Sequence, residues 1–101
     1  MPKKSKKLSI GDRRRTAVIS IAHMSKSDME LIGKGIKPAG LLFIGEYSYV
    51  FNHLIHWGNW AELGFSRTFY NNVRRVLNQG FDRVELDRDA DRVAGLPAFD
   101  W

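Results

Sequence analysis

The fold depends most on the segment Leu41–Trp57, which reads LLFIGEYSYVFNHLIHW. Its large apolar side chains recur at steps of three and four residues, at Phe43, Tyr47, Val50, Leu54 and Trp57. That spacing predicts an amphipathic helix, which would begin near Pro38, a residue that suits the first helical turn, and end at Gly58. Aromatic and β-branched residues suit strands equally, so strands at 41–44 and 47–51 are the alternative.

The next segment carries the clearest helix signal in the chain. Trp60–Leu63 can form one helical turn that Gly64 closes, and Ser66 then has the position of an N-cap, with Phe65 and Tyr70 placed as a hydrophobic staple. Gly80 would stop this helix. Its predicted buried stripe consists of Phe69, Val73, Val76 and Leu77.

Shorter elements flank these two segments. Residues 16–22 (TAVISIA) are β-branched and partly alternating, which predicts a strand. The Ser27-x-x-Glu30 spacing is that of a capping box, so we expect a short helix there that ends near Gly33 and Gly35. Residues 81–86 alternate as a strand does, and residues 92–94 could pair back on them as a hairpin.

The predicted fold class is therefore α+β and mainly helical. It has three to four helices, a short N-terminal strand and, as an option, a C-terminal β-hairpin. The chain has 101 residues, of which 44% are hydrophobic, and this predicts one globular domain over 16–101. The chain lacks cysteine, which excludes a disulfide framework and makes a cytoplasmic location the expectation. Its apolar runs are too short for a membrane span or a signal peptide.

The positive charge lies almost entirely in residues 1–15, which we call the basic arm. The arm carries a net +6, so that residues 16–101 carry −1 of the total of +5. A basic arm favours a polyanionic partner, above all nucleic acid, although a disordered solubility tail fits the same residues. The arm's candidate phosphate-binding residues are Lys3, Lys4, Lys6, Lys7, Arg13, Arg14 and Arg15.

The predicted outer face of the 66–79 helix contains no acidic residue. Arginine offers paired donors that match guanine, and asparagine can both donate to and accept from adenine, so this composition favours contact with DNA. The candidate DNA-binding residues on the helix are Ser66, Arg67, Thr68, Asn71, Asn72, Arg74, Arg75 and Asn78. The alternative is an ordinary packing helix whose polar side chains are merely solvated.

The segment Trp60–Leu77, WAELGFSRTFYNNVRRVL, resembles the turn and second helix of helix-turn-helix DNA-binding proteins. The resemblance implies that Ser66, Arg67, Asn71 and Arg75 face the major groove. It also implies that Thr68 or Arg74 contacts phosphate.

Other chemistry is weakly represented in the sequence. His53 and His56, with Glu46 two turns earlier on the predicted helix, make a poor metal site, and we find no catalytic set. We expect no metal, no cofactor and no enzymatic activity. The predicted function is a small DNA-binding regulator of the phage or mobile-element type, for which a homodimer would fit paired half-sites. The alternative is an adaptor or inhibitor that binds a host protein through exposed aromatics or its acidic C-terminal third.

Overall fold

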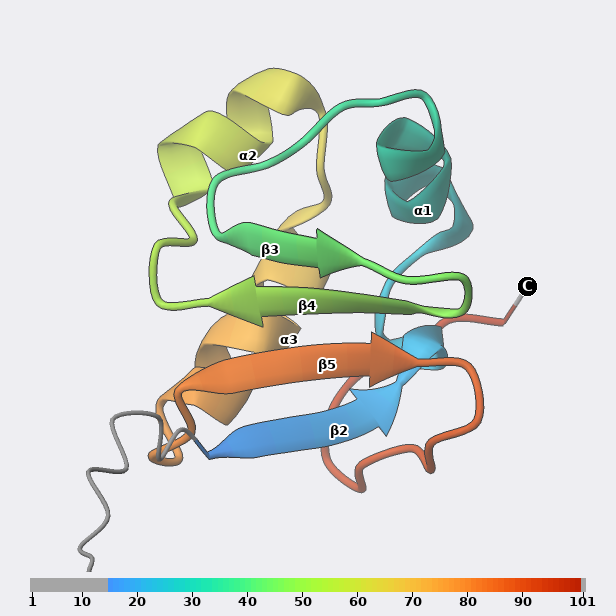
Figure 1. The fold of residues 1–101 in the computed structure, drawn as a ribbon, viewed down its shortest axis with the longest axis vertical. Helices are drawn as coiled ribbons and strands as arrows, with labels where there is room; N and C mark the ends of the chain where they lie inside the picture. Colours follow the sequence, from blue (N-terminus) through green and yellow to red (C-terminus); the bar gives the residue numbers. More distant parts are fainter. Residues whose placement is uncertain (1–14, 101) are drawn as a thin grey trace, which may run out of the picture.

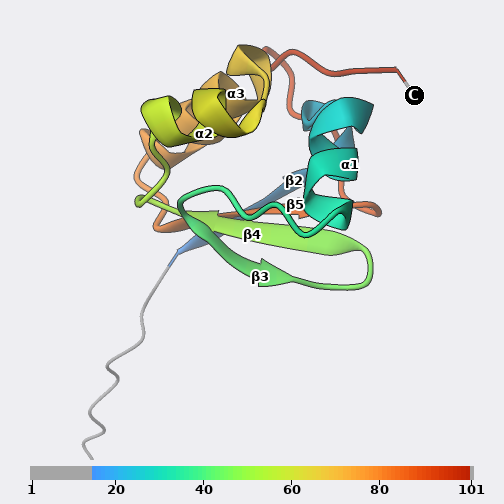
Figure 2. The same ribbon diagram turned by 90° about the horizontal axis from the view of Figure 1, so that it is seen from above.

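The computed structural model describes residues 15–100. Its elements, in chain order, are β2 (Thr16–Ser20), a 3-10 turn η1 (Ile21–His23), α1 (Lys26–Gly33), β3 (Leu41–Ile44), β4 (Ser48–Asn52), α2 (Trp57–Leu63), α3 (Arg67–Leu77) and β5 (Arg83–Asp87). The strands form one sheet, and all three α-helices cover the same face of it (Figures 1 and 2). Within residues 15–100, no element covers the opposite face of the sheet.

The sheet has the strand order β2-β5-β4-β3 and mixed directions (Figure 1). β5 runs parallel to β2 and antiparallel to β4, and β4 runs antiparallel to β3. β5, which comes last in the sequence among the described strands, therefore lies between β2 and β4. Among the described strands, β2 and β3 lie at the two edges.

The helix predicted across Leu41–Trp57 is wrong, and the alternative with two strands is correct. β3 and β4 form a hairpin, closed by a hydrogen bond of 2.7 Å from the Gly45 N–H to the Ser48 carbonyl. Phe51 is fully buried while its neighbour Val50 is not, which is the two-residue period of a half-buried strand. The central sheet also overturns the predicted fold class, because the protein is α+β but not mainly helical.

The optional C-terminal hairpin is not formed, because both sides of β5 are taken by β2 and β4. Residues 91–100, which we call the C-terminal strap, instead bind across the end of β2. The Ser20 N–H donates to the Asp91 carbonyl at 3.1 Å, and the Phe99 N–H donates to the Ala22 carbonyl at 2.7 Å. The strap thus covers part of one sheet edge.

The core lies between the sheet and the helices and is centred on Trp60. This ring is fully buried, with ring centroids 5.0 to 5.6 Å from those of Phe51, Phe65, Phe69 and Tyr70. The predicted stripe of α3 is confirmed as buried, and Ser66 is its N-cap, accepting from the Phe69 N–H. Gly64, at φ +97°, ends α2 in the left-handed region that glycine adopts most easily.

The short helix predicted from Ser27 is confirmed as α1, but its capping box lies two residues earlier. Ser25 is the N-cap and Asp28 the third helical residue, and each side chain accepts from the other's backbone N–H. Asp28 is fully buried and also accepts from the Ser66 N–H at 2.8 Å and the Ser66 Oγ at 2.7 Å. One carboxylate thus fixes the N-termini of α1 and α3 to each other.

Candidate interaction surface

The basic arm is described only at its last residue. Lys3, Lys4, Lys6, Lys7, Arg13 and Arg14 lie outside the described residues. Arg15 is exposed; its guanidinium lies 4.7 Å from the centre of the Phe81 ring and donates to the Gly80 carbonyl at 3.3 Å. The arm therefore joins the domain beside the C-terminal end of α3.

Two of the predicted DNA-reading residues of α3 are engaged inside the protein. Asn72 is 1% exposed, and its amide donates to the His23 carbonyl at 2.8 Å and the Pro97 carbonyl at 3.0 Å. Asn72 therefore lies beneath the C-terminal strap and not on the outer face of the helix, where it was predicted. The Ser66 hydroxyl donates to the Asp28 carboxylate and accepts from the Phe69 N–H, so both of these bonds hold it as the N-cap of α3.

The arginines of α3 also make contacts within the chain. Arg74 donates to the Ile55 carbonyl at 3.2 Å and to the Tyr70 hydroxyl at 2.9 Å. Arg67 stacks over Trp57 at 4.5 Å, and Arg75 donates to the Gly95 carbonyl at 3.1 Å. Thr68 is half-buried. Of the predicted DNA-binding residues on α3 and its C-cap, four are exposed: Arg67, Asn71, Arg75 and Asn78.

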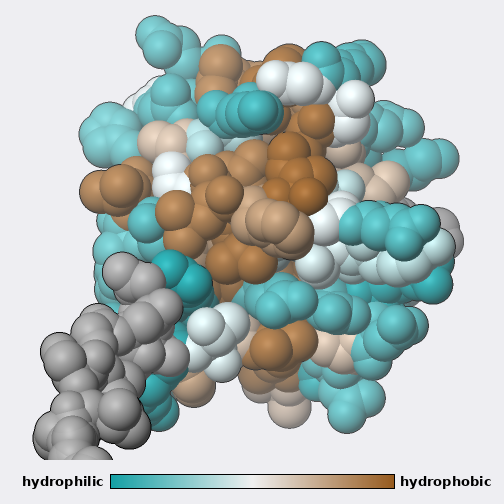
Figure 3. All heavy atoms as spheres, in the orientation of Figure 1, coloured by the Kyte–Doolittle hydropathy of each residue, from teal (hydrophilic) through white to brown (hydrophobic). Residues whose placement is uncertain are grey.

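The most distinctive surface lies instead on and around the β3–β4 hairpin. Large apolar side chains are exposed here, and the space-filling view shows a brown area across the middle of the open sheet face (Figure 3). Phe43 is 57% exposed and Leu54 is 72% exposed. The apolar patch consists of Leu42, Phe43, Ile44, Tyr47 and Leu54.

A charged strip along β5 borders the apolar patch. Arg83, Glu85 and Asp87 alternate with the buried Val84 and Leu86, so their side chains face the open side of the sheet. The register places Phe43 beside Val50, Val50 beside Glu85, and Glu85 beside Val18 on the far edge. Apolar and acidic side chains therefore lie in one row across the open face.

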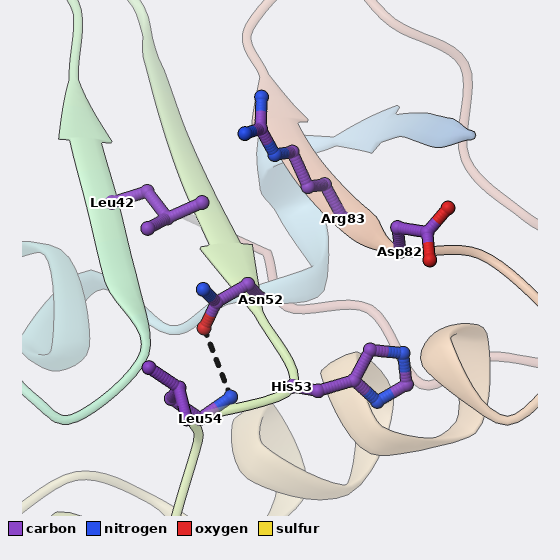
Figure 4. A pocket seen from close by; sticks show the side chains of 6 residues that line it. All are labelled: Leu42, Asn52, His53, Leu54, Asp82 and Arg83. Carbon is purple, nitrogen blue, oxygen red and sulfur yellow. Dashed lines mark hydrogen bonds between the residues drawn. The ribbon is translucent and has the colours of Figure 1, made fainter. Parts of the chain in front are cut away.

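A shallow hollow of about 300 Å³ lies at one end of the patch. Leu42, Asn52, His53 and Leu54 line its hairpin side, and Asp82 and Arg83 come from the start of β5 (Figure 4). Most of its polar side chains are already bonded to the backbone. His53 Nε2 bonds the Phe81 carbonyl at 2.9 Å, Asp82 accepts from the Arg15 N–H, and Asn52 accepts from the Leu54 N–H. The hollow thus extends the patch with a polar rim.

The histidines considered for a metal site act separately. His56 is the N-cap of α2, accepting from the Asn59 N–H through Nδ1 at 3.2 Å, while His53 bonds Phe81. Across residues 15–100, no group of three or more histidine, aspartate or glutamate side chains is placed to hold a metal ion.

Sequence reasoning missed the apolar patch because it assigned Phe43, Tyr47 and Leu54 to the buried side of a helix. The sequence contains no signal of this exposure, because Leu41–Ile44 are four consecutive large apolar residues. A strand that long without a polar residue is usually buried on both faces. Here the strand lies at the sheet edge, and three of its four residues are exposed.

A family model described as the C-terminal domain of a family of unknown function (DUF5983) matches residues 16–101. The chain belongs to this family. No curated protein and no solved structure matches it. Membership of the DUF5983 family overturns the resemblance of Trp60–Leu77 to helix-turn-helix proteins. The geometry agrees, since α3 packs its apolar stripe on a sheet and α2, which precedes it, has only seven residues.

The family match does not indicate what the site does, because the family has no assigned function. Among the described residues, no helix combines the length and the apolar character that a membrane span requires.

Proposed function

We propose that this domain is a non-enzymatic protein-interaction module that binds its partner through the apolar patch. The observation that carries the proposal is the concentration of exposed large apolar side chains on one hairpin, in a domain that buries Trp60, Phe51 and Phe69 completely. Such patches on soluble domains mark interaction sites. We further propose a cytoplasmic setting, which the cysteine-free sequence favours.

The size of the patch is sufficient for binding. Five large residues, which are 44% to 72% exposed, together present on the order of 500 Å², which is near the upper end for the largest patch of a monomer. Burying that area would contribute roughly 12 kcal/mol before the costs of association are subtracted. Modest complementarity would therefore give measurable affinity.

The charges around the patch favour a protein partner over nucleic acid. Glu85 and Asp87 lie on the same sheet face, and Glu46 lies in the hairpin turn beside Tyr47. Phosphate groups approaching the exposed aromatics would meet these carboxylates. Arg88, stacked over Tyr47 at 3.8 Å, adds an aromatic and arginine pair of the kind enriched in protein interfaces.

DNA binding by α3 and the basic arm stays a second candidate. One observation favours it: Arg15 lies beside Gly80, so the arm joins the domain at the C-terminal end of the exposed residues Arg67, Asn71, Arg75 and Asn78. An acid-free helix face and a basic arm would then adjoin. This candidate does not use the apolar patch.

Photo-crosslinking in the host cell tests the leading proposal. A benzoylphenylalanine side chain replaces Phe43 in the patch or, as a matched control, Asn71 on the exposed side of α3. We expect a discrete crosslinked product from position 43 and none from position 71. Products from position 71 alone would contradict the proposal.

Fluorescence anisotropy on duplex DNA tests the second candidate. If the arm holds about six phosphates, the logarithm of the binding constant falls with the logarithm of salt concentration at a slope near −5. We expect Arg67→Glu with Arg75→Glu to weaken such binding and Phe43→Lys to leave it unchanged. An unchanged affinity in the double variant would remove α3 from the interface.

A further inference from the structure

We propose that the outer edge of β2 is a second binding site, which takes an extended peptide segment of another protein as an added strand. The segment carries a large apolar side chain on the side that faces the helices, and acidic residues at the end that lies beside Thr16. This site lies on the opposite edge strand from the apolar patch, so it does not depend on the proposed function.

The first support is that two residues of β2 present backbone groups on the outer side of the sheet. The Arg15 carbonyl accepts from an N–H of β5 at 3.2 Å, and backbone groups alternate in direction along a strand, so those of Thr16 and Val18 point away from β5. Ser20 follows the same alternation, because its N–H donates to the Asp91 carbonyl of the C-terminal strap. Within the described part of the chain, the outward groups of Thr16 and Val18 have no backbone partner. An extended peptide would continue the pairing that the strap begins at Ser20.

The second support is that β2 pairs regularly and lacks the features that usually protect an edge strand. Proteins place lysine, proline, inward-pointing charges or bulges on such strands. β2 reads TAVIS, and all five of its residues pair in register with β5. β2 itself therefore presents no charge and no bulge against an added strand.

The third support is an apolar hollow of about 360 Å³ beside this edge. Ala17 and Ile19 line it from β2, Val76 lines it from α3, and Val93 lines it from the C-terminal strap. Among the described residues, its lining includes one polar side chain, that of Gln79, and no charged one. Side chains alternate between the two faces of a sheet, so a residue of the added strand on the side of the helices would stand next to the hollow. The hollow thus selects a large apolar side chain, while backbone bonds to β2 hold the peptide in place.

The charges at the two ends of β2 indicate which residues flank that apolar side chain. Arg15, which is exposed beside Thr16, ends the basic arm, and six further basic residues precede it. Asp82, which accepts from the Arg15 N–H, offsets one of these charges. At the other end of the strand, the exposed Asp91 carries a negative charge beside Ser20. Carboxylates of the peptide are therefore favoured beside Thr16 and disfavoured beside Ser20.

Selection on the full chain from a phage-displayed library of random peptides of about twelve residues tests the proposal. Enriched peptides are expected to repeat apolar residues with the two-residue period of a strand and to carry acidic residues at one end. Fluorescence anisotropy of the synthesised peptides then compares two variants. Val18→Pro removes an outward N–H and no bond to β5, so we expect it to weaken binding about tenfold or more. Val18→Ala, the matched control, keeps the N–H and is expected to bind within about threefold of the wild type.

The outcomes separate this inference from the proposed function. A library that yields no enriched peptide, or peptides that bind Val18→Pro as tightly as the wild type, overturns the β2 site. If Val18→Pro fails to fold by circular dichroism, Val93→Asp takes its place with the same expected loss, because it puts a charge into the hollow from a residue that is 39% exposed. Phe43→Lys changes the apolar patch and is expected to leave peptide binding unchanged. Peptides that Phe43→Lys releases and Val18→Pro retains would support the apolar patch and contradict the β2 site.

Discussion

Asp28 is a single residue whose side chain connects the N-terminal ends of α1 and α3. Its carboxylate accepts four hydrogen bonds, from the backbone N–H and the hydroxyl of both Ser25 and Ser66. We expect Asp28→Asn to lower the free energy of unfolding by about 2 kcal/mol, because an amide has one acceptor oxygen where two backbone N–H groups need one each. Urea unfolding measures the change.

The control for Asp28 also tests which serine caps α1. Ser27, the residue predicted as cap, makes a single exposed bond with the Ser25 hydroxyl. We expect Ser27→Ala to change stability by less than about 0.5 kcal/mol. A loss of comparable size in Ser27→Ala and Asp28→Asn would show that the capping assignment is wrong.

Asn71 and Asn72 are neighbours in the sequence with opposite environments. Asn72 donates to two backbone carbonyls, whereas Asn71 is exposed. We expect Asn72→Ala to cost about 2 kcal/mol of unfolding free energy, because the His23 carbonyl loses its side-chain donor and the Pro97 carbonyl loses one of its two donors. Asn71→Ala is expected to be neutral. Equal effects in thermal unfolding of the two variants would contradict the placement of the C-terminal strap over α3.

Two glycines at helix ends differ at the scale of the element. Gly64 holds φ +97° after α2, while Gly33, the last residue of α1, has no heavy atom within 4 Å of an added Cβ. We expect Gly64→Ala to cost about 1 to 2 kcal/mol, through left-handed strain. Gly33→Ala is expected to be neutral or to stabilise by about 0.5 kcal/mol. Denaturant midpoints of the two variants measure the difference, and a stabilised Gly64→Ala would contradict the turn geometry.

Elements whose signals are local could be predicted from the sequence. Ser66, Gly64 and the stripe of α3 follow from capping, turn chemistry and the helical period, which act within a few residues. The hairpin could not be predicted, because Phe43, Tyr47 and Val50 satisfy a helical and a strand pattern equally. What decides between them is β5, a strand more than 30 residues later that pairs with β4.

The C-terminal strap is tested at the scale of the whole molecule. The buried His23 ring lies between the Pro97 carbonyl, which Nδ1 bonds, and the Val93 N–H, from which Nε2 accepts. We expect removal of residues 92–101 to cost about 3 kcal/mol or more, since it leaves His23 and Asn72 without these partners. The control is Arg92→Ala with Asp100→Ala, an exposed ion pair whose loss should be within about 0.5 kcal/mol. An equally small effect of the truncation would contradict a structural strap.

The exposure of the apolar patch depends on how the whole chain folds, and for that reason the patch could not be predicted well from the sequence. An apolar side chain such as Phe43 is core or surface according to whether a helix covers its side of the sheet. Here all three helices lie on the opposite face (Figure 2). The two exposed aromatic residues, Phe43 and Tyr47, were both predicted on the apolar side of a helix. Asn72 was predicted on the outer face of α3, but the C-terminal strap, which is distant in sequence, covers it.

Hydrogen–deuterium exchange of the wild-type chain, compared between the free protein and its complex with the partner captured by crosslinking at position 43, locates the interface directly. An interface centred on the apolar patch slows exchange in the complex in peptides that cover residues 41–54. Exchange in α3 peptides covering residues 67–78 is expected to stay the same. Slower exchange in α3 with no change across residues 41–54 would contradict the claim that the open sheet face is the binding surface.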